Sequence, residues 1–207
     1  MAVIGIIGLK GGAGRSTLAT NLAVALADSA IVDADPPQGT ATSWGLIREG
    51  KPPPVYTAES LAGLTGSIVD ASRQHSNVIV DTPPRIAEAT RAVVMLADLL
   101  LIPVAPSVAE LWAVGDVLTI LQSAKRLDRS RIVWNRVRSQ TRSAGEIQAE
   151  AKKEIPISAM RSQLGLRVAY TDAMGAGMGV TEYGEPVARE EMQALAREVS
   201  KFLRGGA

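Results

Sequence analysis

The chain has 207 residues, of which 46% are hydrophobic, and its formal net charge at pH 7 is +1. This length and hydrophobic content fit one α/β domain, and we expect a single domain over residues 1–207. The chain has no cysteine and one histidine, His75. This excludes disulfides, thiolate metal sites and cysteine nucleophiles, and it disfavours zinc sites and histidine-based triads. Any hydrolysis must use carboxylates, backbone groups and cations.

The first residues and the longest apolar run indicate a soluble cytoplasmic protein. Residues 1–5 lack the basic region and long apolar stretch of a signal peptide. The apolar run at residues 93–104 is interrupted by Asp98 and Pro103, so it does not read as a membrane span.

Short apolar runs alternate along the chain with helical patterns. The strand candidates are residues 3–7, 30–32, 77–80, 99–104 and 131–134, with a short sixth at 156–158. The helical patterns are residues 16–26, 58–72, 86–97, 109–126, 144–155 and 190–203. Strands that alternate with helices of this length predict a mostly parallel sheet with helices on both faces. We expect the glycine-rich segment 174–179 to be a mobile loop, and Trp44 and Trp112 to be packing residues.

A glycine-rich loop follows the first strand candidate and precedes the first helical pattern. It reads Lys10-Gly11-Gly12-Ala13-Gly14-Arg15-Ser16-Thr17. Glycines let the backbone turn its N–H groups around an anion, and the following helix adds the positive end of its dipole. Relative to the pattern GxxxxGK[ST], Leu9 and Arg15 replace glycine and lysine, and Lys10 adds a second cation. The loop therefore predicts a phosphate-binding site with an unusual set of cations.

Polar residues stand at the ends of the later strand candidates, namely Asp33, Asp35, Asp81 and Asn135. The carboxyl ends of parallel strands share one edge of a sheet, where α/β proteins bind ligands, so these residues should converge on the loop. A single aspartate at a strand end is commonly a turn or cap residue, but its occurrence beside a phosphate loop favours a metal site. Ser16 is placed to bind Mg²⁺, with Asp81 close to that ion. Asp33 and Asp35 alternate along an extended segment and point the same way, so one can hold metal-bound water while the other orients the attacking water.

On these residues the chain resembles the ParA/MinD family of ATPases, which carry a deviant Walker A motif. The resemblance covers nearly the whole chain and is carried by residues 10–17, 32–39, 78–84 and 101–107 and by the closing region through Gly184. It implies a fold similar to P-loop NTPases, with ATP and Mg²⁺ as cofactors. The length, and the lack of an N-terminal DNA-reading extension, resemble the short subgroup. That subgroup includes plasmid partition ATPases and ATPases that position carboxysomes or chemotaxis clusters.

The resemblance implies a role for each matched residue. Lys10 would be the signature lysine, which crosses an ATP-dependent homodimer to reach the partner subunit's phosphates. Asp35 would position the hydrolytic water, and Ser16, Asp33 and Asp81 would act around Mg²⁺. Asn135 would approach the adenine. The remaining nucleotide-binding residues would be Gly11, Gly12, Ala13, Gly14, Arg15, Ser16 and Thr17.

The chain departs from the family pattern at three places. Arg15 replaces the loop lysine, and because its planar guanidinium is bulkier than an ammonium, we expect nucleotide binding with slow or impaired hydrolysis. The segment Pro36-Pro37 contains one extra proline, and the connection at residues 27–29 is short.

Basic residues are concentrated in the later part of the chain. Residues 120–170 contain eleven lysines and arginines against four acidic residues, whereas residues 1–100 contain seven against nine. Solvated helix faces would explain this pattern, but the resemblance implies nonspecific binding of double-stranded DNA by the ATP-bound dimer. The 3% aromatic content argues against stacking on single strands. The candidate DNA contacts are Arg136, Arg138, Arg142, Lys152, Lys153, Arg161 and Arg167.

The function that the resemblance implies is an ATP-driven positioning enzyme of the nucleoid. Its dimer would coat DNA, and a ParB-like or other cargo adaptor would stimulate hydrolysis and release it. A MinD-like membrane switch is one alternative, with Lys201, Phe202 and Arg204 of the last helix as a membrane contact. Core packing by Met192, Leu195 and Val199 is the competing role of that helix, and it makes a membrane partner the less favoured one. A metabolic ligase with a phosphate loop is a distant third interpretation, because the chain has no insertion that would build a second substrate pocket.

Overall fold

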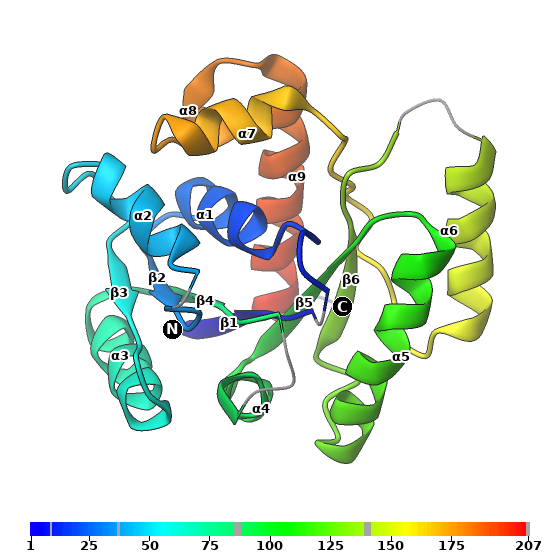
Figure 1. Ribbon diagram of the computed structural model, residues 1–207, viewed down its shortest axis with the longest axis horizontal. Helices are drawn as coiled ribbons and strands as arrows, with labels where there is room; N and C mark the ends of the chain where they lie inside the picture. The colour runs from blue at the N-terminus through cyan, green and yellow to red at the C-terminus, as the bar shows by residue number, and fades with distance from the viewer. Residues whose placement is uncertain (9, 37, 85–87, 139–141, 206–207) are drawn as a thin grey trace.

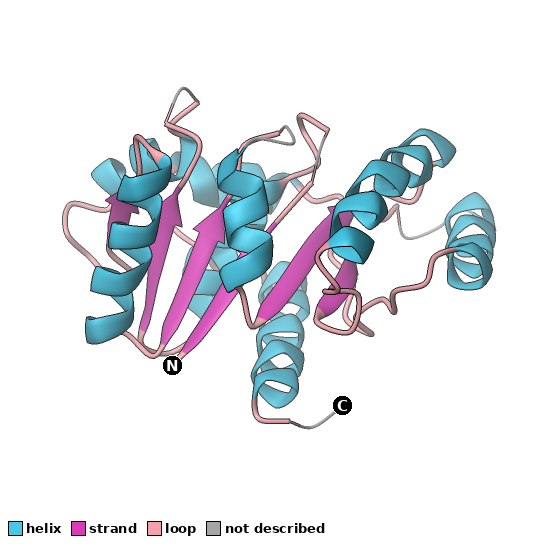
Figure 2. Cartoon of the chain, turned by 90° about the horizontal axis from the view of Figure 1, so that it is seen from below, coloured by secondary structure: helices cyan, strands magenta, loops and turns pink. Residues whose placement is uncertain are grey.

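Six parallel strands form the centre of the computed structural model, which describes residues 1–8, 10–36, 38–84, 88–138 and 142–205. The strand order is β3-β2-β4-β1-β5-β6, and every neighbouring pair is parallel. This sheet confirms the predicted α/β class (Figure 1, Figure 2). The strands are β1 (Ala2–Ile6), β2 (Ser29–Asp33), β3 (Val55–Thr57), β4 (Asn77–Asp81), β5 (Leu99–Val104) and β6 (Ser130–Trp134).

Helices cover both faces of the sheet (Figure 1). One face carries α1 (Arg15–Ala25), α2 (Thr40–Ile47), α7 (Val168–Gly175), α8 (Val180–Tyr183) and α9 (Pro186–Leu203). The other face carries α3 (Leu61–Gln74), α4 (Glu88–Leu96), α5 (Val108–Ser123) and α6 (Arg142–Glu154). None of the helices in the described ranges has both the length and the apolarity that a membrane span needs.

Alternate residues of each strand supply two separate cores, because successive side chains of a strand point to opposite faces. In β1, Ile4 and Ile6 pack on the side of α1 and α9, whereas Val3 packs on the side of α3 and α4. The apolar face of α9 is buried against the sheet, which confirms the core-packing role predicted for this helix. Its buried side chains are Ala188, Met192, Leu195, Ala196 and Val199.

The strand register brings the predicted polar residues to one edge. Asp81 at the end of β4 pairs with Ile6 of β1 and with Asp33 of β2. Because the strands are parallel, the loop after β1 and the aspartates after β2 and β4 leave the sheet side by side. The predicted convergence of these segments is therefore confirmed.

Several elements differ from the sequence prediction. The patterns gave no signal for β3, α2, α7 or α8. Residues 156–158 form no strand; the adjacent Ala159 makes only an isolated bridge to Ile132 at the edge of β6. The pattern at 58–72 is helical only from Leu61, because β3 ends at Thr57 and Ser60 caps α3 through the N–H of Gly63. The start of the pattern at 86–97 lies outside the described residues.

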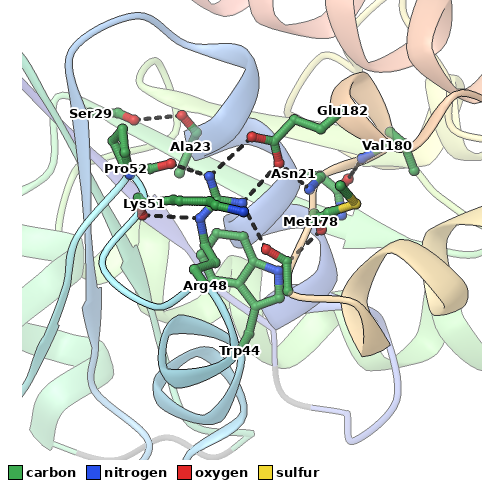
Figure 3. A network of polar contacts seen from close by, with 12 residues as sticks. Asn21, Ala23, Ser29, Trp44, Arg48, Lys51, Pro52, Met178, Val180 and Glu182 are labelled. Carbon is green, nitrogen blue, oxygen red and sulfur yellow. Dashed lines mark hydrogen bonds and ion pairs between the residues drawn. The ribbon is translucent and has the colours of Figure 1, made fainter.

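Arg48, buried just after α2, fixes the segment that follows α7 (Figure 3). Its guanidinium donates to the carbonyl of Gly177 at 2.7 Å and to both carboxylate oxygens of Glu182 at 2.8 and 3.1 Å. It also lies over the Trp44 ring, 4.7 Å from the ring centroid, and Trp44 is buried as predicted. The mobile loop predicted at 174–179 is therefore wrong, because the first residues of this segment complete α7 and Arg48 holds the turn that follows.

Replacing Arg48 by methionine is expected to lower the free energy of unfolding by about 2 to 3 kcal/mol, because Gly177 loses its donor and Glu182 loses its cation. Urea denaturation followed by circular dichroism measures this loss. Arg73→Met is the control, since Arg73 forms an exposed ion pair with Asp70 at 3.2 Å and should cost no more than about 0.5 kcal/mol. Equal midpoints for the two variants would contradict a structural role for Arg48.

Candidate nucleotide-binding site

The segment between β1 and α1 leaves the first turn of α1 open to an anion. Gly14 precedes the helix with a φ of 85°, in the left-handed region that favours glycine. A Cβ at this position would lie 2.5 Å from Nδ2 of Asn135, so the loop requires glycine here. The first turn of α1, which lies within the described ranges, has no acidic residue and no side-chain cap. Its N–H groups are thus available to phosphate oxygens, and phosphate binding at this turn stays a prediction. Leu9 lies outside the described residues.

The Arg15 side chain is buried beneath this loop, with an exposed fraction of 8%. Its Nη1 donates to the carbonyls of Gly8 at 2.9 Å and Lys10 at 2.8 Å, and its Nε donates to the carbonyl of Thr82 at 3.0 Å. Burial lowers the pKa of the guanidinium, and the nearby Asp81 and Asp35 carboxylates oppose that shift. Arg15 therefore places a positive charge inside the loop and ties the loop to the end of β4.

Asp81 is almost fully buried at the end of β4, with an exposed fraction of 2%. Burial raises the pKa of its carboxyl to about 7; the Ser16 side chain opposes this shift and Asp33 reinforces it. Within the described residues, Oδ1 of Asp81 is a buried oxygen that accepts no hydrogen bond. A divalent cation held between Ser16 and Asp81 would satisfy this oxygen, so the two residues fit Mg²⁺.

The protein itself would provide only part of the coordination of this ion. The described part of the chain contains no group of three or more acidic or histidine side chains that could hold a metal on its own. Mg²⁺ would therefore depend on phosphate oxygens as well as on Ser16 and Asp81, as expected at a phosphate loop.

Asp33 and Asp35 take different positions although they are alternate residues. Asp33 is buried, and its carboxylate accepts hydrogen bonds from the N–H of Asp35 at 3.0 Å and from the N–H and hydroxyl of Thr42 at 2.9 and 2.8 Å. In this structure Asp33 holds the loop and the start of α2, and its role at Mg²⁺ stays a prediction. Asp35 is half-buried beside a cavity of about 470 Å³ that Pro36, Pro83 and Pro84 also line. Pro37 lies outside the described residues.

Asn135 contacts the loop directly from the end of β6. Its Nδ2 donates to the carbonyl of Ala13 at 2.9 Å, and its Oδ1 accepts from the N–H of Arg136 at 2.9 Å. Arg136 in turn donates from Nη1 to the carbonyl of Gly12 at 3.0 Å. The structure thus brings Asn135 to the nucleotide site, where its predicted contact with adenine stays a prediction. The structure also places Arg136 at this loop, although the sequence predicted a DNA contact for Arg136.

Lys10 forms an ion pair within the same chain. Its Nζ lies 2.8 Å from Oε1 of Glu110, in the first turn of α5, and 47% of the lysine side chain is exposed. Two residues further along α5, the Trp112 side chain is 77% exposed. Trp112 therefore does not pack within the single chain, and its predicted packing at an interface stays a prediction.

The remaining predicted DNA contacts lie mostly near the β6 edge of the sheet. Lys152 and Lys153 are exposed in the last turn of α6, and Arg138 and Arg161 are exposed in the segments that flank this helix. The side chain of Arg142 lies outside the described part of the chain. Arg167 differs, because its guanidinium is paired with Glu191 at 2.7 Å, and that hydrogen bond raises the pKa of Arg167. Since its charge is already neutralised, Arg167 adds little to a DNA-binding surface.

A model of the CobQ/CobB/MinD/ParA nucleotide-binding domain matches residues 4–180, which is most of the chain. The chain belongs to this family. Membership in the CobQ/CobB/MinD/ParA family accounts for the phosphate loop and for the convergence of Asp33 and Asp81 on it. It also confirms the family resemblance seen in the sequence.

Two relatives match nearly the whole chain, and both are called maintenance of carboxysome distribution protein A. The protein from Halothiobacillus neapolitanus is 26% identical over 208 residues, which cover 95% of this chain and 95% of the relative. The protein from Gloeobacter kilaueensis is 30% identical over 223 residues, which cover 98% of this chain and 95% of the relative. A solved structure of a McdA variant from Cyanothece in complex with ATP has a TM-score of 0.76 and 20% identity, over 97% of this chain and 96% of that chain. This structural likeness shows the shared fold.

Three contacts of this CobQ/CobB/MinD/ParA domain were not foreseen from the sequence: Thr42 on Asp33, Glu110 on Lys10 and Arg136 on Gly12. Thr42 lies in a helix that the pattern did not reveal, and Glu110 is one of many surface acids. Only Arg136 carried a signal, because it directly follows the polar residue at the end of a strand.

Proposed function

We propose that this chain is an ATP-dependent positioning ATPase that dimerises with ATP, binds nonspecific DNA and is released by a cargo-linked partner. Near-full-length similarity to two carboxysome distribution proteins carries this proposal. The phosphate loop and Lys10 support the ATPase part of it. A carboxysome or a similar cytoplasmic body is the cargo that these relatives favour, with an adaptor protein of that cargo as the partner.

In the proposed reaction, the chain binds and orients ATP through groups that are already in place. The N–H groups of the loop and the buried Arg15 would hold the phosphates. Ser16 and Asp81 would hold Mg²⁺, which supplies charge neutralisation for phosphoryl transfer. Asp35, half-buried beside its cavity and close enough to influence Arg15 and Asp81, would orient the attacking water.

Dimerisation would require Lys10 to exchange its partner. In the single chain its ammonium is paired with Glu110 at 2.8 Å. Because 47% of the lysine side chain is exposed, water screens its side of the pair, and the phosphates of a nucleotide on a facing subunit would compete for Lys10. Trp112, two residues after Glu110 in α5, is exposed, and covering it with a partner subunit would bury apolar surface and favour the dimer.

DNA binding would use the basic side chains near the β6 edge, namely Arg138, Lys152, Lys153 and Arg161. Contacts to phosphates need positive charge without base recognition, which suits scattered basic residues on a surface.

We expect purified protein to be retained on nonspecific duplex DNA with ATP and Mg²⁺ but not with ADP. The double variant Lys152→Ala/Lys153→Ala should reduce the slope of log affinity against log salt by about 2, because two phosphate contacts are lost. Filter binding over a salt series measures both effects, with Arg73→Ala as the control for an exposed cation elsewhere. No retention at low salt with either nucleotide would contradict the DNA part of the proposal. ATP-dependent sedimentation with anionic liposomes would favour a membrane switch instead.

A further inference from the structure

Side chains hold the carbonyl groups of the phosphate loop on both sides of its centre. Arg15 binds the carbonyls of Gly8 and Lys10 from below. The carbonyls of Gly12 and Ala13 accept hydrogen bonds from two consecutive residues of another segment, Arg136 at 3.0 Å and Asn135 at 2.9 Å. An anion-binding loop works only when its N–H groups face the anion and its carbonyls face away. The contacts of Arg15, Asn135 and Arg136 hold the loop carbonyls in the orientation that faces away from the anion.

The backbone at Arg136 is shaped for this contact. Its φ is 56°, in the left-handed region that a residue with a side chain rarely adopts. The Oδ1 of Asn135 accepts the N–H of Arg136 at 2.9 Å and so stabilises this turn. Such a conformation persists only where surrounding contacts hold it, and it is concentrated at functional sites. At this position it lets two adjacent side chains, Asn135 and Arg136, reach two adjacent carbonyls.

We propose that Arg136 is a positioning residue of the nucleotide site, which holds the Gly12 carbonyl away from the phosphates and adds a positive charge beside them. The proposal rests on nucleotide binding by the proposed ATPase but not on its DNA binding or its cargo. Arg136 and Asn135 form a two-point clamp, in which the guanidinium supplies a charge-assisted donor and the amide a neutral one. The contribution of Arg136 to DNA binding is correspondingly small.

The test measures nucleotide affinity and DNA retention separately. Arg136→Ala should weaken binding of a fluorescent ATP analogue, with Mg²⁺ and without DNA, about tenfold, the value of one charge-assisted hydrogen bond. Arg136→Gly should show the same loss of affinity. Because glycine adopts the left-handed backbone without strain, this variant should be at least as stable to heat as Arg136→Ala. Arg136→Lys should restore part of the affinity, because an ammonium can donate to one carbonyl. Arg73→Ala is the matched control and should bind the analogue as wild type does.

The outcomes separate this proposal from its alternatives. Wild-type affinity for the analogue in both Arg136→Ala and Arg136→Gly would overturn it, and a loss of DNA retention in those variants would then return Arg136 to the DNA surface. A tenfold loss of affinity in a protein that never binds DNA would leave the clamp intact while the proposed DNA function fails. A larger KM for ATP with an unchanged kcat at saturation would support positioning, because a damaged fold would lower both the bound fraction and the turnover.

Discussion

Replacing Arg15 by alanine is expected to weaken ATP binding at least about 100-fold. The change removes a buried cation. The carbonyls of Gly8, Lys10 and Thr82, which accept hydrogen bonds of 2.8 to 3.0 Å from Arg15 in the wild type, lose their donor. The change also removes the charge that favours the ionised Asp81 carboxylate, so that uncompensated negative charge meets the incoming phosphates. Titration with a fluorescent ATP analogue in the presence of Mg²⁺ measures the loss.

Arg15→Lys separates the charge from the shape of this side chain. A compact ammonium keeps the charge but cannot bridge the carbonyls that the guanidinium joins, so the loop becomes less rigid. We expect ATP affinity within about tenfold of wild type and a faster turnover, since the site then holds the cation found in the common loop pattern. Phosphate release assays, with DNA present and absent, measure the turnover. Equal turnover in the two proteins would show that Arg15 does not limit hydrolysis.

The positions of the strands and of the site could be predicted because they depend on local patterns. The run that becomes β4 is rich in β-branched residues and ends at Asp81, and the apolar run that becomes β5 is stopped by prolines. Once the chain alternates between strands and helices, the parallel register puts Asp33 and Asp81 together without further information.

The missed elements depend on tertiary contacts rather than on their own sequences. The helix α2, Thr40–Ile47, contains a glycine and two threonines, and the segment has no clear apolar face. It is held at its start by the bonds between Thr42 and Asp33 and at its end by the packing of Trp44 beneath Arg48. β3 has three residues and lies at the end of the sheet, where it pairs with β2.

The roles of individual cations could not be read from the sequence for a similar reason. Arg136 and Arg167 both lie in the basic part of the chain, yet one donates to the phosphate loop and the other is neutralised by Glu191. The difference depends on the left-handed backbone at Arg136 and on the contact of Arg167 with Glu191 of α9, and a count of charges shows neither. Charge patterns therefore located a basic surface but did not assign its members.

Asp81→Asn is expected to lower ATP turnover by about 10- to 100-fold, because a neutral amide holds Mg²⁺ much more weakly than a carboxylate does. The amide has nearly the same shape, so the sheet edge should keep its structure. Turnover measured against Mg²⁺ concentration should show a higher requirement for the ion in the variant. Unchanged turnover and Mg²⁺ dependence would remove Asp81 from the metal site.

The same substitution should make the protein more stable when nucleotide and Mg²⁺ are absent. Burial raises the pKa of Asp81 from 3.8 to about 7, so the ionised carboxylate destabilises the folded state. The penalty is absent below pH 4, grows as pH rises towards 7, and reaches on the order of 2 to 4 kcal/mol above that. Asparagine carries no such penalty, so the gain in unfolding free energy over wild type should be largest at pH 8 and shrink towards pH 5. Urea denaturation at the two pH values tests this, and equal stability at pH 8 would mean that another group already compensates the charge. Asp81 would then destabilise the protein without nucleotide and Mg²⁺ but be needed for turnover. This combination is expected of a carboxylate that is buried in order to bind a metal ion.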